Sequence, residues 1–304
     1  MLSTADINGA VLGARADDAP FDVVAVGSRD GARAQAYAHE HGIANAHSTY
    51  DALLGDDGVD AVYIALPNAL HHEWTMRALA AGKHVICEKP YTRYPNQVDE
   101  AHDEAERNGL VLTEAHMWRH ARQTALLREL LPRVGELRAV QATFTGALLR
   151  ADDVRWQREL GGGALLDLGC YCISAARLVT GREPDRVHGE AQPQGEVDGS
   201  FAGTLHFEDL TATFQCSLVA ALVNTIDVIG ADGVLRVPSA FVNPPGLVVL
   251  NGDEHRVEAG NHYRDELEDF CAAIRGERAP LIGRDEMRGQ ARVLDLLLGG
   301  RGSD

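Results

Sequence analysis

The sequence predicts an α/β protein with two domains. We expect residues 1–118 to form a doubly wound parallel sheet, and residues 119–304 to form an α+β domain with a large, mostly antiparallel open sheet. Two patterns lead to this prediction. In the first part, short apolar runs alternate with helix-length segments, as in β-α repeats. In the second part, longer runs with partial polar alternation follow one another, as antiparallel strands do.

The elements of the first domain follow from the spacing of its apolar residues. Strand-length apolar runs stand at residues 21–26, 59–66, 84–87 and 110–113. Segments with helical spacing stand at residues 9–15, 29–41, 71–81 and 96–108. Because the strands are apolar throughout, both faces of the sheet must be covered, which indicates parallel strands flanked by helices.

The second domain is predicted from longer runs in which apolar and polar residues partly alternate. These runs cover residues 136–145, 203–207, 212–218 and 223–229. The tetrapeptide from Gly230 to Gly233 has the composition of a hairpin turn between two neighbouring strands. We therefore expect a mostly antiparallel sheet.

The acidic composition limits the kinds of partner. With 28 Lys and Arg against 45 Asp and Glu, the net charge is −17, which argues against binding to nucleic acid or to an anionic membrane. The five cysteines stand mostly in apolar runs, and we interpret them as reduced core residues of a cytoplasmic protein. We find no secretory signal and no apolar segment of 18 residues, so we expect neither secretion nor membrane insertion.

The N-terminus departs from the usual opening of a dinucleotide-binding domain. Such domains begin with a strand that ends in G-x-G-x-x-G, and here Ser3, Ala5 and Asn8 occupy the three glycine positions. Ser3 and Ala5 are small enough for close approach of a pyrophosphate to the backbone, and the following helix can still present its N-terminus. We therefore include Ser3, Thr4, Ala5, Asp6 and Ile7 among the predicted cofactor-binding residues.

The first strand itself is short. Only Met1 and Leu2 stand where that strand normally runs, so we interpret it as truncated. We expect residues 1–3 to insert between the strands around Val24 and Ile64, with little ladder pairing.

The end of the next predicted strand favours NADP over NAD. An acidic residue at that position normally binds the ribose 2′-hydroxyl of NAD, whereas this strand ends in Ser28 and Arg29, which suit a 2′-phosphate. Arg33 lies one helical turn further on and would add a second positive charge. The alternative is a solvated helix start in which Asp30 acts as the cap.

Lys89 is a candidate catalytic residue. It is one of only two lysines in a chain that otherwise uses arginine, which suggests that a titratable ammonium is needed there. It follows the predicted strand 84–87, and ligands of open α/β sheets bind at the carboxyl ends of the strands. The alternative is a surface lysine at the end of a strand.

Two motifs carry a resemblance to a known family. The segments 66–71 (LPNALH) and 81–90 (AGKHVICEKP), followed by 161–171 (GGGALLDLGCY), resemble the signatures of the glucose-fructose oxidoreductase/inositol dehydrogenase (Gfo/Idh/MocA) family. Tyrosine at position 171 is similar to the branch that contains glucose-fructose oxidoreductase and dihydrodiol dehydrogenase. The resemblance implies a Rossmann domain followed by a domain whose open sheet forms a homodimer or homotetramer interface.

A proton-transfer pair can be argued from chemistry. Moving a hydride from a secondary alcohol to a nicotinamide requires removal of the hydroxyl proton, and a phenol can take it if an ammonium stabilises the phenolate. Tyr171 and Lys89 fit these roles if the two domains bring them together. Asp167 lies four residues before Tyr171 and would share its helix face. The alternatives are a core tyrosine and a helix-capping aspartate.

The remaining site residues are implied by the resemblance. The cofactor is expected to contact Leu66, Pro67, Asn68, His71, Glu88, Lys89, Glu114, Ala115, Trp156 and Tyr263. Gln157 replaces the arginine that usually follows the tryptophan, which puts an ionic contact at that position in doubt. Substrate hydroxyls are expected to meet Lys89, His116, Arg119, Asp167 and Tyr171. A metal at His116 and His120 is disfavoured because no third ligand suggests itself.

These residues predict an NADP-dependent oxidoreductase that acts on a secondary alcohol or ketone of a sugar, cyclitol or related polyol. One alternative is a regulator that binds a dinucleotide without turnover. Another is an inactive, truncated family member, which the short first strand would favour. Intact Lys89, Asp167 and Tyr171 favour the enzyme.

Overall fold

The chain forms two compact units. A computed structural model describes residues 1–148 and 150–299. The first unit contains Met1–Met117 and Tyr263–Arg288, and the second contains Trp118–His262 and the residues from Gly289 on. The second unit therefore differs from the expected domain of residues 119–304, because residues 263–288 return to the first unit. This return was not visible in the sequence, since nothing in the pattern of α8 (His262–Ile274) says which sheet it covers.

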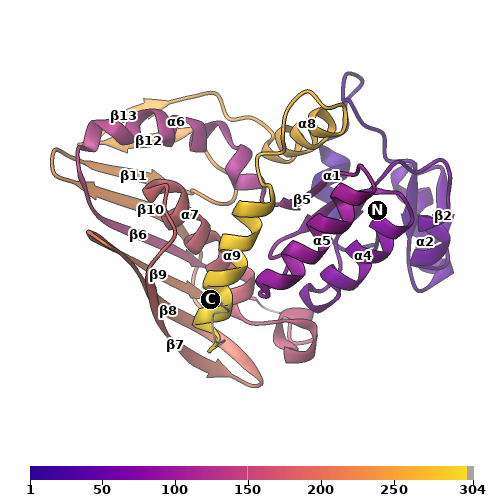
Figure 1. Cartoon of the computed structure of the whole chain (residues 1–304), viewed down its shortest axis with the longest axis horizontal. Helices are drawn as coiled ribbons and strands as arrows, with labels where there is room; N and C mark the ends of the chain where they lie inside the picture. Colours follow the sequence, from indigo (N-terminus) through magenta and orange to yellow (C-terminus); the bar gives the residue numbers. More distant parts are fainter. Residues whose placement is uncertain (149, 300–304) are drawn as a thin grey trace. The chain divides into compact units, whose positions relative to one another are not determined.

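The first unit is built on short parallel strands (Figure 1). The strands are β1 (Ala25–Gly27), β2 (Asn45–His47), β3 (Ala61–Ile64), β4 (His84–Glu88) and β5 (Leu112–Ala115). The helices are α1 (Asn8–Gly13), α2 (Gly31–His41), α3 (Tyr50–Leu54), α4 (His71–Ala80), α5 (Pro95–Arg107), α8, and the first turn of α9 (Arg284–Leu297). β1 pairs with β2, and β3, β4 and β5 pair in that order, all in parallel.

The N-terminal residues join the two groups of parallel strands, as expected. Leu2 forms isolated parallel bridges with Gly27 and with Ile64. The Leu2 N–H donates to the Tyr63 carbonyl at 2.9 Å, and the Gly27 N–H donates to the Met1 carbonyl at 3.0 Å. Leu2 has no exposed surface. A short segment is enough here because its few backbone groups are paired on both sides.

Some predicted elements of the first unit were wrong in their boundaries. The strand expected at residues 21–26 is limited to β1, and the one expected at residues 110–113 is β5, which begins two residues later. β2 and α3 were not predicted. β2 is the tripeptide Asn-Ala-His, which carries no strand signal and pairs only because β1 lies beside it.

The second unit contains an eight-stranded sheet with helices α6 (Arg122–Leu130) and α7 (Cys170–Thr180) packed against it (Figure 1). Its strands are β6 (Leu137–Thr145), β7 (Arg186–Gln194), β8 (Val197–Phe207), β9 (Leu210–Ser217), β10 (Val223–Gly230), β11 (Val234–Pro238), β12 (Leu247–Leu250) and β13 (Asp253–Arg256). The order is β13-β12-β11-β10-β6-β9-β8-β7, and only the β6–β9 pair is parallel. The predicted fold class is therefore confirmed.

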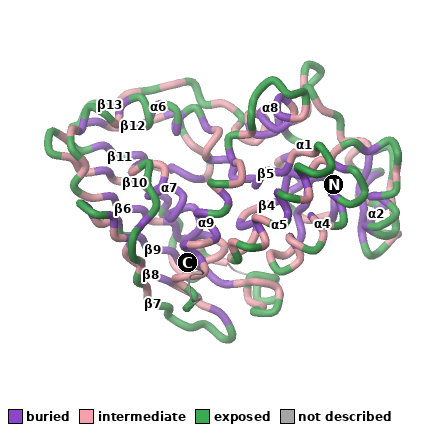
Figure 2. The backbone as a smooth tube through the Cα atoms, viewed as in Figure 1, coloured by how far each residue is buried: buried purple, intermediate pink, exposed green. Residues whose placement is uncertain are grey.

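The hairpin predicted at Gly230–Gly233 is confirmed, because the Gly230 N–H donates to the Gly233 carbonyl at 2.9 Å between β10 and β11. The edge strands β7 and β13 were not predicted, since both are polar and largely exposed (Figure 2). β7 gains its strand conformation by pairing along the whole of β8.

The expectation that the chain lacks an 18-residue apolar segment was wrong. Residues Arg158–Thr180, within the described part of the chain, are long and apolar enough to cross a membrane by length and composition alone. However, 72% of the most apolar window is buried inside the protein, as in the core helix of a folded domain. Burial of α7 against the sheet accounts for its composition.

Ser3 provides a test of how the N-terminal turn is stabilised. It has a φ of 129°, a conformation that favours glycine, yet its hydroxyl donates to the Ala65 carbonyl at 2.8 Å and accepts the Ala5 N–H at 3.2 Å. Ser3→Ala loses both hydrogen bonds and keeps the strain, so we expect a loss of about 1–3 kcal/mol in the free energy of unfolding.

Ser3→Gly loses the same bonds but releases the strain, and we expect it to be about 1 kcal/mol more stable than Ser3→Ala. Urea unfolding of the three proteins measures both differences. Equal stability of the alanine and glycine variants would show that the backbone at Ser3 is not strained.

Candidate active site

Lys89 lies at the carboxyl end of β4, in a turn whose backbone is held by the residue before it. The Lys89 N–H donates to Glu88 Oε2 at 3.2 Å, and the Tyr63 hydroxyl donates to Glu88 Oε1. The Lys89–Pro90 peptide bond is cis. Glu88 therefore ties the start of the turn to β3, and the Lys89 N–H is held by a partly buried hydrogen bond.

His71 joins this turn to the loop that follows β3. Its side chain has no exposed surface, and its Nδ1 lies 2.9 Å from the Pro90 carbonyl and its Nε2 2.8 Å from the Leu66 carbonyl. Burial lowers the pKa of His71, and the two carbonyl partners oppose that shift. Both ring nitrogens face protein carbonyls, so we interpret His71 as a support of the two loops. The predicted contact of His71 with the cofactor stays a prediction.

The other predicted residues of this region lie close by in the first unit. Glu114 and Ala115 are the last residues of β5 and are buried, and Glu114 Oε1 accepts the Tyr91 N–H at 2.8 Å. Burial raises the pKa of Tyr263, at the start of α8, and the nearby Glu88 carboxylate raises it further. Pro67 and Asn68 begin the short helix that leads into α4. His116 is buried just after β5.

The predicted 2′-phosphate residues gather at the start of α2. The buried Ser28 hydroxyl accepts the Asp30 N–H at 3.2 Å, and Asp30 in turn caps α2 by accepting the N–H groups of Ala32 and Arg33. The capping role considered for Asp30 is thus confirmed, and it leaves the basic side chains beside it without a carboxylate partner. Among residues 1–148 and 150–299, neither Arg29 nor Arg33 forms an ion pair.

Tyr50, the first residue of α3, marks where the two arginines converge. Burial raises the pKa of Tyr50, and the Arg29 and Arg33 charges oppose that rise, with Arg29 also in hydrogen-bonding reach of the phenol. The Tyr50 ring is held edge-on against Trp74, with ring centroids 4.9 Å apart. Two guanidinium groups near one hydroxyl form a site suited to an anion. The sequence analysis missed Tyr50, because only the fold brings α3 beside α2.

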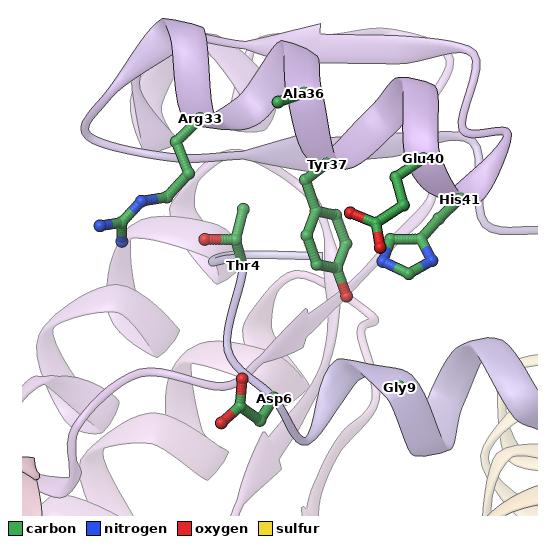
Figure 3. A pocket seen from close by; sticks show the side chains of 8 residues that line it. All are labelled: Thr4, Asp6, Gly9, Arg33, Ala36, Tyr37, Glu40 and His41. Atoms are coloured by element: carbon green, nitrogen blue, oxygen red, sulfur yellow. The ribbon is translucent and has the colours of Figure 1, made fainter.

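A pocket of about 490 Å³ opens beside this basic cluster (Figure 3). It lies between the N-terminal turn, where Thr4 and Asp6 stand, and the face of α2 that carries Arg33 and Tyr37. The pocket therefore brings two groups of predicted cofactor residues to one place, the turn after Leu2 and the first turn of α2. Thr4 and Tyr37 supply hydroxyl groups and Arg33 a positive charge, while Asp6 and Glu40 add acidic groups to the same lining.

In the second unit, the glycine run 161–163 turns the chain into the helix that carries Asp167 and Tyr171. Gly163 has a φ of 116°, and a Cβ on Gly162 would lie 2.4 Å from the Arg155 carbonyl oxygen, so only glycine fits both positions. A π-helical segment (Leu165–Gly169) follows and continues into α7. π-Helical turns are rare and occur mostly at functional sites.

Asp198 and Arg155 hold this helix start, and the sequence analysis missed both. Asp198 Oδ2 accepts the Leu165 N–H at 2.7 Å, while Arg155 Nε lies 3.0 Å from Asp167 Oδ2. Arg155, two residues before Gln157, thus forms an ion pair with Asp167. Trp156 is held locally, since its Nε1 donates to the Arg150 carbonyl at 3.0 Å.

Tyr171 lies in an aromatic environment. Its ring centroid is 5.1 Å from that of Phe144, in an edge-to-face contact, and 5.6 Å from that of Phe241. These aromatic contacts fix the orientation of the Tyr171 ring and so the direction in which its hydroxyl points. The fold brings Arg119 to the same helix, where its Nη1 lies 3.4 Å from the Ser174 hydroxyl.

Comparison with known proteins gives similar results for both units. The model of an oxidoreductase family with an NAD-binding Rossmann fold matches residues 8–116, and the model of the GFO/IDH/MocA C-terminal domain matches residues 126–236. The chain is 36% identical to the D-xylose 1-dehydrogenase (NADP(+)) 2 of Haloferax volcanii over 290 residues, which cover 91% of this chain and 88% of that protein. It is 31% identical to the scyllo-inositol 2-dehydrogenase (NADP(+)) of Bacillus subtilis, over 85% of this chain and 80% of that one.

Solved structures agree with these relatives. The 3-ketoreductase KijD10 from Actinomadura kijaniata, in complex with NADP and TDP-benzene, superposes with a TM-score of 0.92 and 30% identity, over 98% of this chain and 96% of that one. The resemblance seen in the sequence motifs is confirmed, and the chain belongs to the GFO/IDH/MocA family of oxidoreductases.

Proposed function

We propose that the protein is an NADP-dependent oxidoreductase that interconverts a secondary alcohol and a ketone on a sugar, cyclitol or related polyol. The observation that carries this proposal is the position of Lys89, at the carboxyl end of β4, in a backbone held by Glu88 and Tyr63. The named relatives act on xylose and scyllo-inositol with NADP(+), which supports the same substrate class.

The basic cluster supports the choice of NADP. Arg29 and Arg33 converge near Tyr50, beside a pocket that also contains Thr4, and Asp30 is engaged as a helix cap. These residues would hold the 2′-phosphate and its ribose. A bound nicotinamide supplies an acceptor or donor of hydride.

The remaining chemistry is proton transfer by the chain's own residues. Tyr171 would take the proton of the substrate hydroxyl during oxidation and return it during reduction. Lys89 would stabilise the phenolate, because a nearby positive charge lowers the pKa of a phenol. Asp167, held by Arg155, would accept a hydrogen bond from the substrate.

Two further features are proposed rather than tested. We propose assembly as a homodimer or homotetramer through the open face of the eight-stranded sheet, and residence in the cytoplasm, which suits five cysteines that form no disulfide among the described residues.

Cofactor choice can be tested at Arg29. Arg29→Ala should reduce the preference for NADPH over NADH by about 1.5–3 kcal/mol, the usual range for hydrogen bonds to charged groups. Fluorescence titration with both cofactors measures the preference. Arg107→Ala, an exposed arginine of α5, is the matched control and should keep it. Unchanged discrimination in Arg29→Ala would remove this residue from the cofactor site.

The proton-transfer pair can be tested by kinetics. Lys89→Ala and Tyr171→Phe should each leave NADPH binding largely intact and lower kcat by about 10²–10⁴. The double variant should lose little more than either single variant, because the two residues would act as a unit.

A panel of sugars and polyols with NADP⁺ provides the assay, and Tyr94→Phe, at an exposed tyrosine, is the control. Full activity in Tyr171→Phe would assign the proton to another group. NADPH binding without turnover of any substrate on the panel would favour a dinucleotide-binding regulator.

A further inference from the structure

Glu266 is a buried carboxyl group that none of the preceding roles uses. It lies on α8, is 3% exposed, and accepts the backbone N–H of His116 at the end of β5. Its Oε1 is buried and has no hydrogen-bond partner among the residues that the structure describes. An unpaired buried carboxylate oxygen is costly, which favours the uncharged form of Glu266.

The groups that face Glu266 are mostly acids. Glu88 on β4, Glu114 on β5 and Asp269 on α8 all raise its pKa, after the larger contribution of burial. Two phenols, Tyr63 on β3 and Tyr263 on α8, also lie close enough to interact with it. Burial and neighbouring negative charges both disfavour the ionised form of a carboxyl group.

The hydrogen bonds indicate which carboxyl group keeps the proton. Glu88 accepts the Tyr63 hydroxyl and the Lys89 N–H, Glu114 accepts the Tyr91 N–H, and Asp269 pairs with Arg278 at 2.8 Å. Each of these three groups has donors that stabilise its ionised form. Glu266 accepts one N–H, its Oε1 is unpaired, and it has no ion pair among the described residues, while the negative charges of the other three groups oppose its ionisation.

We propose that Glu266 is a positioning residue that stays protonated at neutral pH, and that its uncharged carboxyl keeps a second negative charge away from the Glu88–Lys89 turn. Ionisation of Glu266 would add a negative charge that opposes the ionised form of Glu88, the group that accepts the Lys89 N–H. The link to catalysis rests on the proposed function, whereas the protonation state itself does not.

The sign of the pH effect follows from linkage. Between the ordinary pKa of a glutamate and the raised value in the folded protein, only the unfolded chain loses this proton, so rising pH favours unfolding. The ratio of the unfolding equilibrium constants, wild type over Glu266→Gln, should therefore rise by up to tenfold per pH unit. Glu268→Gln, on the same helix but ion-paired with Arg264 at the surface, is the matched control and should show no such rise.

Infrared spectroscopy tests the proton directly in the wild-type protein. At neutral pH we expect the C=O band of a protonated carboxylic acid, present in Glu268→Gln and absent in Glu266→Gln. Glu266→Gln should keep kcat/KM within about threefold at neutral pH, and any alkaline decline of kcat/KM that the wild type shows should move or disappear.

Absence of the protonated band in the wild type would overturn the proposal, even if the glutamine variant fails to fold. Parallel pH dependence of unfolding in wild type and Glu266→Gln would also overturn it, as would loss of activity in a folded Glu266→Gln at neutral pH. If the infrared and stability results hold while no substrate is turned over, the proposed function fails and the protonation state stands.

Discussion

The buried carboxyl edge of β3, β4 and β5 sets the constraint on which the first unit depends. Polar backbone groups at this edge are removed from water and must be paired. His71 pairs such groups in two loops at once, since its ring nitrogens lie within hydrogen-bonding distance of the carbonyls of Leu66 and Pro90. Glu88 accepts a hydrogen bond from the Lys89 N–H, and Glu114 accepts one from the Tyr91 N–H. The Lys89 backbone is thereby held at the end of β4.

The second unit holds its predicted site residues by the same means. A glycine run admits a close backbone approach, Asp198 accepts an N–H at the helix start, and Arg155 orients Asp167. Phe144 and Phe241 hold the ring of Tyr171. Rigid supports of this kind suit the proposed role in proton transfer, because small displacements of a catalytic group lower the reaction rate.

The sequence predicted those features that repeat along the chain or form contiguous motifs. Apolar runs predicted β3 and β4, and motifs marked Lys89, Asp167 and Tyr171 as site candidates. Short or polar strands such as β2 and β7 were missed because pairing with a neighbour, and not composition, makes them strands. Tyr50, Arg155, Asp198 and Glu266 were missed for a related reason, since each acquires its role through contacts that only the fold creates.

The central claim is that the protein transfers a hydride between NADP and a carbon that bears a hydroxyl group. Its most direct test is to follow deuterium from NADPH labelled on one or the other face of the nicotinamide into a ketose or oxidised cyclitol, by mass spectrometry and NMR of the product. We expect one deuterium on the new carbinol carbon, from only one of the two labelled cofactors. A reduced product without deuterium from either cofactor would contradict the account.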